Sequence, residues 1–191
     1  MIKLDIPYLS QHENKVSNGG SLACVAMAAG VGLDAVLARL GRPGAERNKP
    51  VLFADLIRIL RSYGMNSEYK RPLYLPQIKS YLAEGMPVIL LANIEQAVEK
   101  PGPFSTGQFI LAVGYNNIGL YVHNSSWAGN VGAYLWLPDA LVDTAMRQPG
   151  WGNIPFQGLL IQQAYPFLAG TEPSLPRTVR PPERWRACWP T

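Results

Sequence analysis

The segment from residue 87 to residue 124 restricts the possible folds more than any other part of the chain. Its first part, Pro87 to Asn93, is a continuous apolar run, as in a strand that is buried on both faces. Two further apolar stretches, Gln108 to Tyr115 and Leu120 to Asn124, flank the turn sequence Asn-Asn-Ile-Gly. Two such stretches around a short turn are typical of an antiparallel hairpin. The sequence therefore predicts an antiparallel sheet in the second half of the chain.

Helical patterns dominate the first half. Small, helix-favouring residues run from Leu22 to Ala29, with Ser21 as the expected cap and Gly30 as the stop. Apolar residues recur at helical spacing in three further stretches, each followed by a glycine. Helices that precede an antiparallel sheet indicate an α+β fold. The predicted helices are 22–29, 34–40, 52–63, 75–82 and 138–147, the last opened by Pro138, and the predicted strands are 2–9, 65–71, 87–93, 108–115, 120–124 and 157–163.

The composition fits one globular domain followed by a tail. The chain has 191 residues, of which 48% are hydrophobic and 16% charged, enough for one domain with a sizeable core. We place this domain at residues 1–165. Prolines then recur up to position 190, and such a sequence cannot form regular helices or strands. Residues 166–191 are therefore predicted to form an extended tail with polyproline character.

The net charge and the cysteine content limit the expected cellular location of the protein and the kinds of partner it can bind. The net charge of +4 is modest, and no basic stripe with interleaved aromatic residues indicates a nucleic-acid site. No apolar run is long enough for a membrane span, and residues 1–7 lack the features of a signal peptide. Two cysteines, Cys24 and Cys188, lie far apart, and neither they nor the histidines form a metal-binding pattern. We expect no metal or cofactor, and a location in the cytoplasm or inside an assembled particle such as a virion.

Five short motifs in this order resemble those of one enzyme family. They are a short strand ending in glutamine (Ile6–Gln11), a helix start (Gly20–Met27), Glu-Gly-Met-Pro-Val (Glu84–Val88), an apolar strand opened by Gly-Gln-Phe (Gly107–Tyr115), and Val-His-Asn (Val122–Asn124). The pattern is similar to that of the C39-like peptidases, a branch of the papain-like cysteine peptidases. The resemblance covers about residues 4 to 163 and implies a papain-like fold with N-terminal helices packed on an antiparallel sheet.

Two catalytic positions of that family carry other residues here. The resemblance places Gly20 at the position of the nucleophilic cysteine and Gln108 at the position of the histidine base. It makes Gln11 the former oxyanion donor and Asn124 the former orienting residue. Glycine has no side chain that could attack a carbonyl carbon, and an amide does not exchange protons near neutral pH. The resemblance therefore predicts a pseudoenzyme with no catalytic residues.

Three residues are alternative candidates for catalysis. Cys24 is the fallback nucleophile, but it lies one helical turn beyond Gly20 among core-like residues, where cysteine usually packs as a small hydrophobic residue. His123 neighbours Asn124 in a strand and so points to the opposite face. His12 is expected to be a solvated loop residue. For Gln108 and Asn124, we weigh a groove that binds peptide backbone against a simple bond between the two amides, and favour the latter.

The tail carries the remaining candidate binding residues. Arg184, Trp185, Arg186 and Trp189 combine the two residue types that dominate protein–protein binding sites, in a segment without a core of its own. We interpret residues 166–191 as a docking arm that anchors the domain to protein partners or neighbouring subunits.

The sequence leaves three hypotheses for the function of the chain. It is an inactive structural or binding subunit of a larger assembly, a peptidase or amidase with Cys24 as relocated nucleophile, or a pseudopeptidase that recognises peptides in its cleft.

Overall fold

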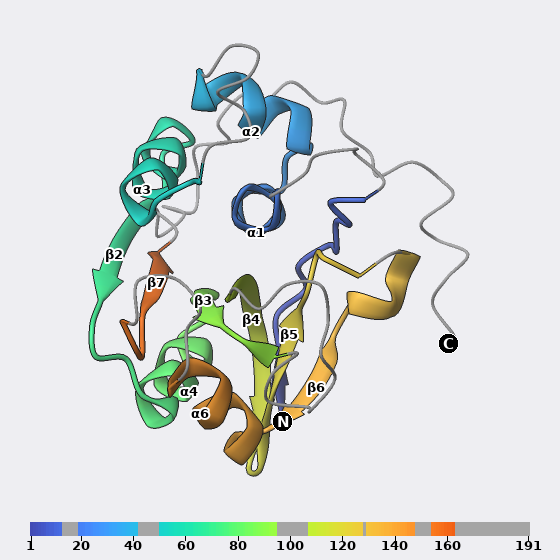
Figure 1. The fold of residues 1–191 in the computed structure, drawn as a ribbon, viewed down its shortest axis with the longest axis vertical. Coiled ribbons are helices and arrows are strands. Elements are labelled where there is room, and N and C mark those ends of the chain that lie inside the picture. The colour runs from blue at the N-terminus through green and yellow to red at the C-terminus, as the bar shows by residue number, and fades with distance from the viewer. Residues whose placement is uncertain (13–18, 42–49, 95–106, 128, 148–153, 163–191) are drawn as a thin grey trace, which may run out of the picture.

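The computed structural model describes residues 1–12, 19–41, 50–94, 107–127, 129–147 and 154–162. Seven antiparallel strands form one sheet in this part of the chain (Figure 1). The order across the sheet is β2-β7-β3-β4-β5-β6, and β1 pairs with the far end of β4. The bounds are β1 Ile2–Lys3, β2 Asn66–Lys70, β3 Val88–Ala92, β4 Gln108–Asn116, β5 Gly119–His123, β6 Leu135–Pro138 and β7 Gly158–Gln162.

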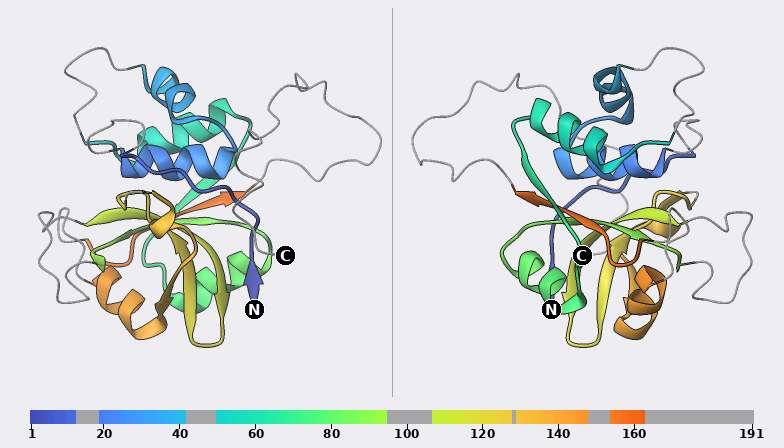
Figure 2. Two further views of the ribbon diagram at one scale, coloured as in Figure 1. Left: turned by 90° about the vertical axis from the view of Figure 1, so that its right-hand side faces the viewer. Right: turned by 60° about the vertical axis from the view of Figure 1, so that its left-hand side comes forward.

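The five helices of the described residues cover both faces of this sheet. On one face lie α1 (Gly20–Ala29), α2 (Leu33–Leu40) and α3 (Phe53–Ser62), and on the other lie α4 (Leu75–Ala83) and α6 (Asp139–Arg147) (Figure 2). In Figure 1, α1 is seen end-on between α2, α3 and the sheet. The architecture confirms the predicted α+β fold with N-terminal helices packed on an antiparallel sheet.

Side chains along β4 point alternately to the two faces of the sheet, which explains why the centre of this strand is apolar at every position. Leu111 and Val113 belong to the core cluster under α1 and α3, whereas Ile110 and Ala112 belong to the cluster under α4 and α6. Successive side chains of a strand point to opposite faces, so a strand covered on both sides needs apolar residues at every position. Burial of each large apolar side chain contributes about 1.5–3 kcal/mol, and the sheet centre therefore holds the two helix layers together.

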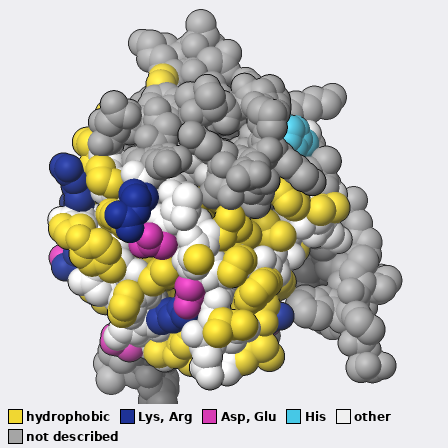
Figure 3. Space-filling model, turned by 60° about the horizontal axis from the view of Figure 1, so that its bottom comes forward, with side chains coloured by type: hydrophobic (Ala, Val, Ile, Leu, Met, Phe, Trp, Pro, Cys, Tyr) yellow, Lys and Arg dark blue, Asp and Glu magenta, His cyan; other side chains and the backbone are white. Residues whose placement is uncertain are grey.

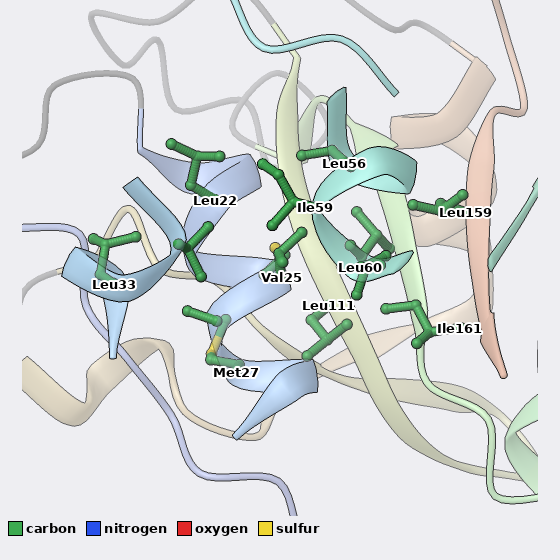
Figure 4. Close-up of a cluster of buried hydrophobic side chains, with 14 of the residues drawn as sticks. Leu22, Val25, Met27, Leu33, Leu56, Ile59, Leu60, Leu111, Leu159 and Ile161 are labelled. Atoms are coloured by element: carbon green, nitrogen blue, oxygen red, sulfur yellow. The ribbon is translucent and has the colours of Figure 1, made fainter. Parts of the chain in front are cut away.

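Helix α1 is the most buried helix of the fold. Its residues Ser21 to Met27 are all buried, because α2 and α3 pack on its outer sides and β4 on its inner side. Figure 4 shows Val25 of α1 lying between Ile59 of α3 and Leu111 of β4. A helix enclosed in this way holds its N-terminus at a fixed point above the sheet, which fixes the position of Gly20.

The structure corrects several predicted elements. Ser21 does not cap α1: the cap position is Gly19, which makes no side-chain hydrogen bond, and Ser21 is buried inside the first turn. Pro138 does not open a helix but ends β6, and α6 begins at the next residue. Strand β6 itself was not predicted, since its sequence is short and only its pairing with β5 makes it a strand. The first strand is limited to residues 2–3 instead of 2–9.

The surface over α4 and α6, on the other face of the sheet from α1, carries both charged and apolar side chains (Figure 3). Figure 3 shows the side formed by α4 and α6, with basic and acidic side chains scattered among apolar ones. One ion pair joins the two helices there, with Lys79 Nζ 2.6 Å from Asp139 Oδ2. Within the described ranges, no helix by itself has both the length and the apolar character to cross a membrane. Only α1 and α2 taken together, with a 113° bend between them, pass that criterion.

Candidate functional site

The N-terminus of α1 meets the ends of two strands at Gly20. A Cβ atom added to this glycine would lie 3.3 Å from Gln11 Oε1, 3.6 Å from Ser125 Oγ and 3.7 Å from the carbonyl oxygen of Phe109. These neighbours come from the N-terminal segment, the turn after β5 and the start of β4. A side chain at position 20 would thus point into a polar corner at the positive end of the helix dipole, where anions are stabilised.

A serine links the two amides at this edge of the sheet. The Ser126 hydroxyl lies 2.7 Å from Gln108 Oε1 and 2.6 Å from Asn124 Oδ1, and the Ser126 N–H donates to Asn124 Oδ1 over 3.1 Å. The structure therefore brings Gln108 and Asn124 together through an amide–hydroxyl–amide link. A hydroxyl has one proton to donate, so it serves one of the two amide oxygens at a time. None of the three groups titrates near neutral pH.

Gln11 lies beside the start of α1. Its backbone N–H donates to the carbonyl oxygen of Ser125 over 2.9 Å, which ties the N-terminal segment to the turn after β5. Its side-chain oxygen is the nearest atom to the space beside Gly20. The four positions singled out by the resemblance thus come from four separate segments and lie around one corner of the fold.

His12 is closer to this corner than expected. The side chain is exposed, as predicted for a loop residue, but its Nε2 contacts the carbonyl oxygen of Ser126. The contact is to the backbone and not to the Ser126 hydroxyl. The imidazole therefore does not form a nucleophile–base pair with that serine in this geometry.

Two buried polar groups at the corner have no partner. Ser125 is 0% exposed and Asn124 is 1% exposed, yet the Ser125 hydroxyl and the Asn124 Nδ2 make no hydrogen bond in the structure. An unpaired buried polar group costs about 1–3 kcal/mol. Both groups can donate, so the corner holds spare donors beside the free N–H groups of the first turn of α1.

Cys24 lies in the core and not beside Gly20. It is 0% exposed and packs in the core cluster between the helices and the sheet. Burial raises the pKa of its thiol far above the usual range, because the apolar surroundings disfavour the thiolate. The thiolate is the reactive form of cysteine, so burial disfavours reaction of Cys24 in the folded chain.

His123 is a structural residue. It is buried, and both ring nitrogens are engaged: Nδ1 accepts from the Tyr134 N–H over 3.0 Å, so Nε2 carries the proton and donates to the carbonyl oxygen of Ile6 over 2.8 Å. Burial lowers the pKa of His123, with the bond to Ile6 acting in the opposite sense. Its ring also packs edge-on against Tyr8 and Tyr134. It points away from Gln108, as the alternation along β5 predicts.

The tail candidates Arg184, Trp185, Arg186 and Trp189 lie outside the described residues. In the described ranges, no group of three or more histidine, cysteine, aspartate or glutamate side chains is arranged to hold a metal ion. Sequence reasoning missed Ser125 and Ser126. Two serines after a strand are ordinary turn residues. Only the fold places them beside the start of β4 and the N-terminus of α1.

Comparison with known proteins places this corner in a known fold. No family model matches the sequence, and no curated protein matches it. Solved structures do match, among them the following two. The double glycine motif protease of an AMS/PCAT transporter, in complex with its leader peptide, aligns with a TM-score of 0.58 and 14% identity over 84% of this chain and 94% of that one. A protein described as a C39-like peptidase from Bacillus anthracis aligns with a TM-score of 0.60 and 14% identity over 84% and 96%. The chain therefore has the fold of the C39-like peptidases.

Proposed function

We propose that this chain is a C39-like domain without peptidase activity, which binds peptide or protein segments at the corner formed by Gly20, Gln108 and Asn124. The observation that supports the proposal is the chemistry of the two residues at the corner that the resemblance aligns with the reacting groups of the family. Gly20 offers no atom that could attack, and Gln108 is bonded to an uncharged hydroxyl. Acyl transfer requires a nucleophile and a group that accepts its proton, so this corner has no means of performing it.

The binding part of the proposal rests on the polar groups that the corner retains. A first helical turn without a side-chain cap and two buried groups without partners are suited to hydrogen bonds with a peptide backbone. The AMS/PCAT transporter protease of the same fold holds a leader peptide. A domain with these donors and no reacting pair would hold a peptide without cutting it.

The alternative of a relocated nucleophile makes a distinct prediction. If Cys24 reacted, a peptide carrying a thiol-reactive group would label it at neutral pH, and Cys24→Ser would abolish the labelling. We expect no labelling of Cys24 in the folded chain, because the thiol is fully buried and un-ionised. Intact-mass analysis in a Cys188→Ser background reads this position alone, and labelling lost with Cys24→Ser would reject the proposal.

The wider role that we propose is that of a subunit in a larger assembly, in the cytoplasm or in a particle formed there, with residues 166–191 as the docking arm. This part rests on the proline, arginine and tryptophan content of the tail. Deletion of residues 170–191 is expected to abolish co-purification with the native partners while the thermal unfolding of the domain is unchanged. Partner association that survives the deletion would reject the docking arm and leave the binding corner untouched.

A further inference from the structure

We propose that the N-terminus of α1 is a carboxylate-binding site, and that its ligand is the free C-terminal carboxylate of a peptide. This inference deepens the proposed function and rests on it. It replaces recognition of an internal peptide bond with recognition of a chain end. Three independent features of the corner carry it: the helix end, the unpaired buried donors, and the space beside Gly20.

The helix end supplies backbone donors. Helix α1 has ten residues, begins at Gly20, and has no side-chain cap, since the cap residue is Gly19. The N–H groups of its first turn have no acceptor within the helix. Ala23 is the first residue whose N–H is satisfied by the helix itself, through the carbonyl oxygen of Gly19 at 2.8 Å. Free N–H groups at the positive end of a helix favour an anion.

The unpaired side chains select the same kind of ligand. Ser125 Oγ lies 3.6 Å from the position of a Cβ on Gly20 and has no hydrogen-bond partner, although the residue is fully buried. The Asn124 Nδ2, in the neighbouring residue, is also buried and unpaired. An amide nitrogen can only donate, so an acceptor must enter to satisfy it. A buried donor without a partner is costly, and a ligand oxygen would remove that cost.

Glycine at position 20 leaves the start of the helix without a side chain of its own. The nearest atom to a Cβ at position 20, Gln11 Oε1 at 3.3 Å, is closer than ordinary van der Waals contact but ends a flexible side chain, the next two atoms lie at 3.6 and 3.7 Å, and Gly20 itself is partly exposed. Gln11 presents its amide to this space and can turn either end toward a ligand by rotation about its last bond. The Phe109 carbonyl oxygen closes the sheet side at 3.7 Å. An anion therefore has to sit toward the helix, in line with its N–H groups.

Titration with acetate tests the site without any assumption about peptide sequence. In amide NMR spectra of the full chain, acetate is expected to shift the signals of Gly20, Ser21 and Leu22 along a saturable curve. Acetamide and chloride at the same concentrations should leave these signals in place. Acetate shifts that do not saturate, or that acetamide or chloride reproduces, would overturn the inference.

Two variants and a matched control sharpen the test. Gly20→Ala fills the space and Ser125→Ala removes a donor, and each is expected to weaken acetate binding about tenfold or more, as for loss of one hydrogen bond to a charged group. Ser67→Ala is the control, because its hydroxyl is also buried and unpaired but lies in β2, outside the corner. Both serine variants remove an unsatisfied group and should fold. Equal acetate affinity in wild type, Gly20→Ala and Ser125→Ala would refute the site.

A peptide pair separates this inference from the proposed function. The acetylated peptide Ala-Ala-Gly-Gly with a free carboxylate is expected to bind more tightly than its C-terminal amide by about tenfold or more. Equal binding of the two peptides would overturn the carboxylate site while peptide binding stands. Saturable acetate binding without binding of either peptide would support the carboxylate site and contradict the peptide as its ligand.

Discussion

Replacement of Gly20 by cysteine is expected to create a thiol with a lowered pKa. The structure accepts the change, because a Cβ at this position meets its three nearest neighbours at 3.3–3.7 Å and the closest of them ends a flexible glutamine side chain. The new sulfur would lie at the N-terminus of α1, where the helix dipole and the free N–H groups stabilise a thiolate over a thiol.

The size of the effect follows from the helix end. An anion at a helix N-terminus gains about 0.3–1 kcal/mol when exposed and up to about 2 kcal/mol when partly buried. Since about 1.4 kcal/mol corresponds to one pKa unit, the introduced thiol should titrate roughly 0.2–1.5 units below the usual value of about 8.5. A further Gln108→His change would place an imidazole at the edge of the corner. An imidazolium paired with the thiolate lowers the thiol pKa by about another 1–3 units.

The assay is the rate of alkylation by iodoacetamide as a function of pH, followed by intact mass in a Cys188→Ser background. Cys24 serves as an internal control, because its buried thiol should not react. A thiol pKa at or above about 8.5 that is unchanged by Gln108→His would refute the reasoning. Positions 20 and 108 would then not form one site.

Three further predictions concern the stability of the corner and its surroundings. Ser126→Ala removes the hydroxyl that links the two amides and should cost about 1–3 kcal/mol in urea unfolding, whereas Ser67→Ala, which removes an unpaired hydroxyl, should cost nothing. Burial lowers the pKa of His123, so the unfolded chain takes up its proton first. Stability should be complete above about pH 6.5 and fall below it as the pH approaches the folded pKa; a His123→Asn variant that keeps the same slope would contradict this. Gly132→Ala would drive a Cβ into a backbone carbonyl and should destabilise the fold by more than about 2 kcal/mol, whereas Gly32→Ala, with open space around it, should leave the thermal midpoint near that of wild type.

The sequence predicted the parts of the fold that depend on local pattern. The apolar run that forms β3, the hairpin of β4 and β5, and four of the five described helices follow from periodicity and glycine stops, within a few residues. The start of α6 was wrong by one residue, because Pro138 is as suitable for the end of an edge strand as for the first turn of a helix. Strand β6 was missed, since its strand character comes from pairing with β5.

The sequence suggested which residues belong to the site, but it did not indicate the hydrogen bonds between them. The family resemblance alone singled out Gly20, Gln108 and Asn124, and the hairpin pattern put the strands that carry Gln108 and precede Asn124 side by side. The link through Ser126 and the unpaired Ser125 hydroxyl depend on how the turn after β5 folds back toward α1. Ser21 is a second example of a feature that the sequence did not predict. Serine is a common helix cap, but Ser21 is buried against the core and lies inside the helix.

The absence of peptidase activity can be tested by exposing the purified chain to a diverse peptide library and detecting products by mass spectrometry. A cysteine peptidase of the same fold serves as the positive control, and the Cys24→Ser and Cys188→Ser variants test any residual signal. No cleavage above the level of buffer is expected, because Gly20 has no side-chain atom that could attack and the Gln108 amide does not exchange protons near neutral pH. Cleavage above that level would contradict this prediction, and its loss in either cysteine variant would identify the residue responsible.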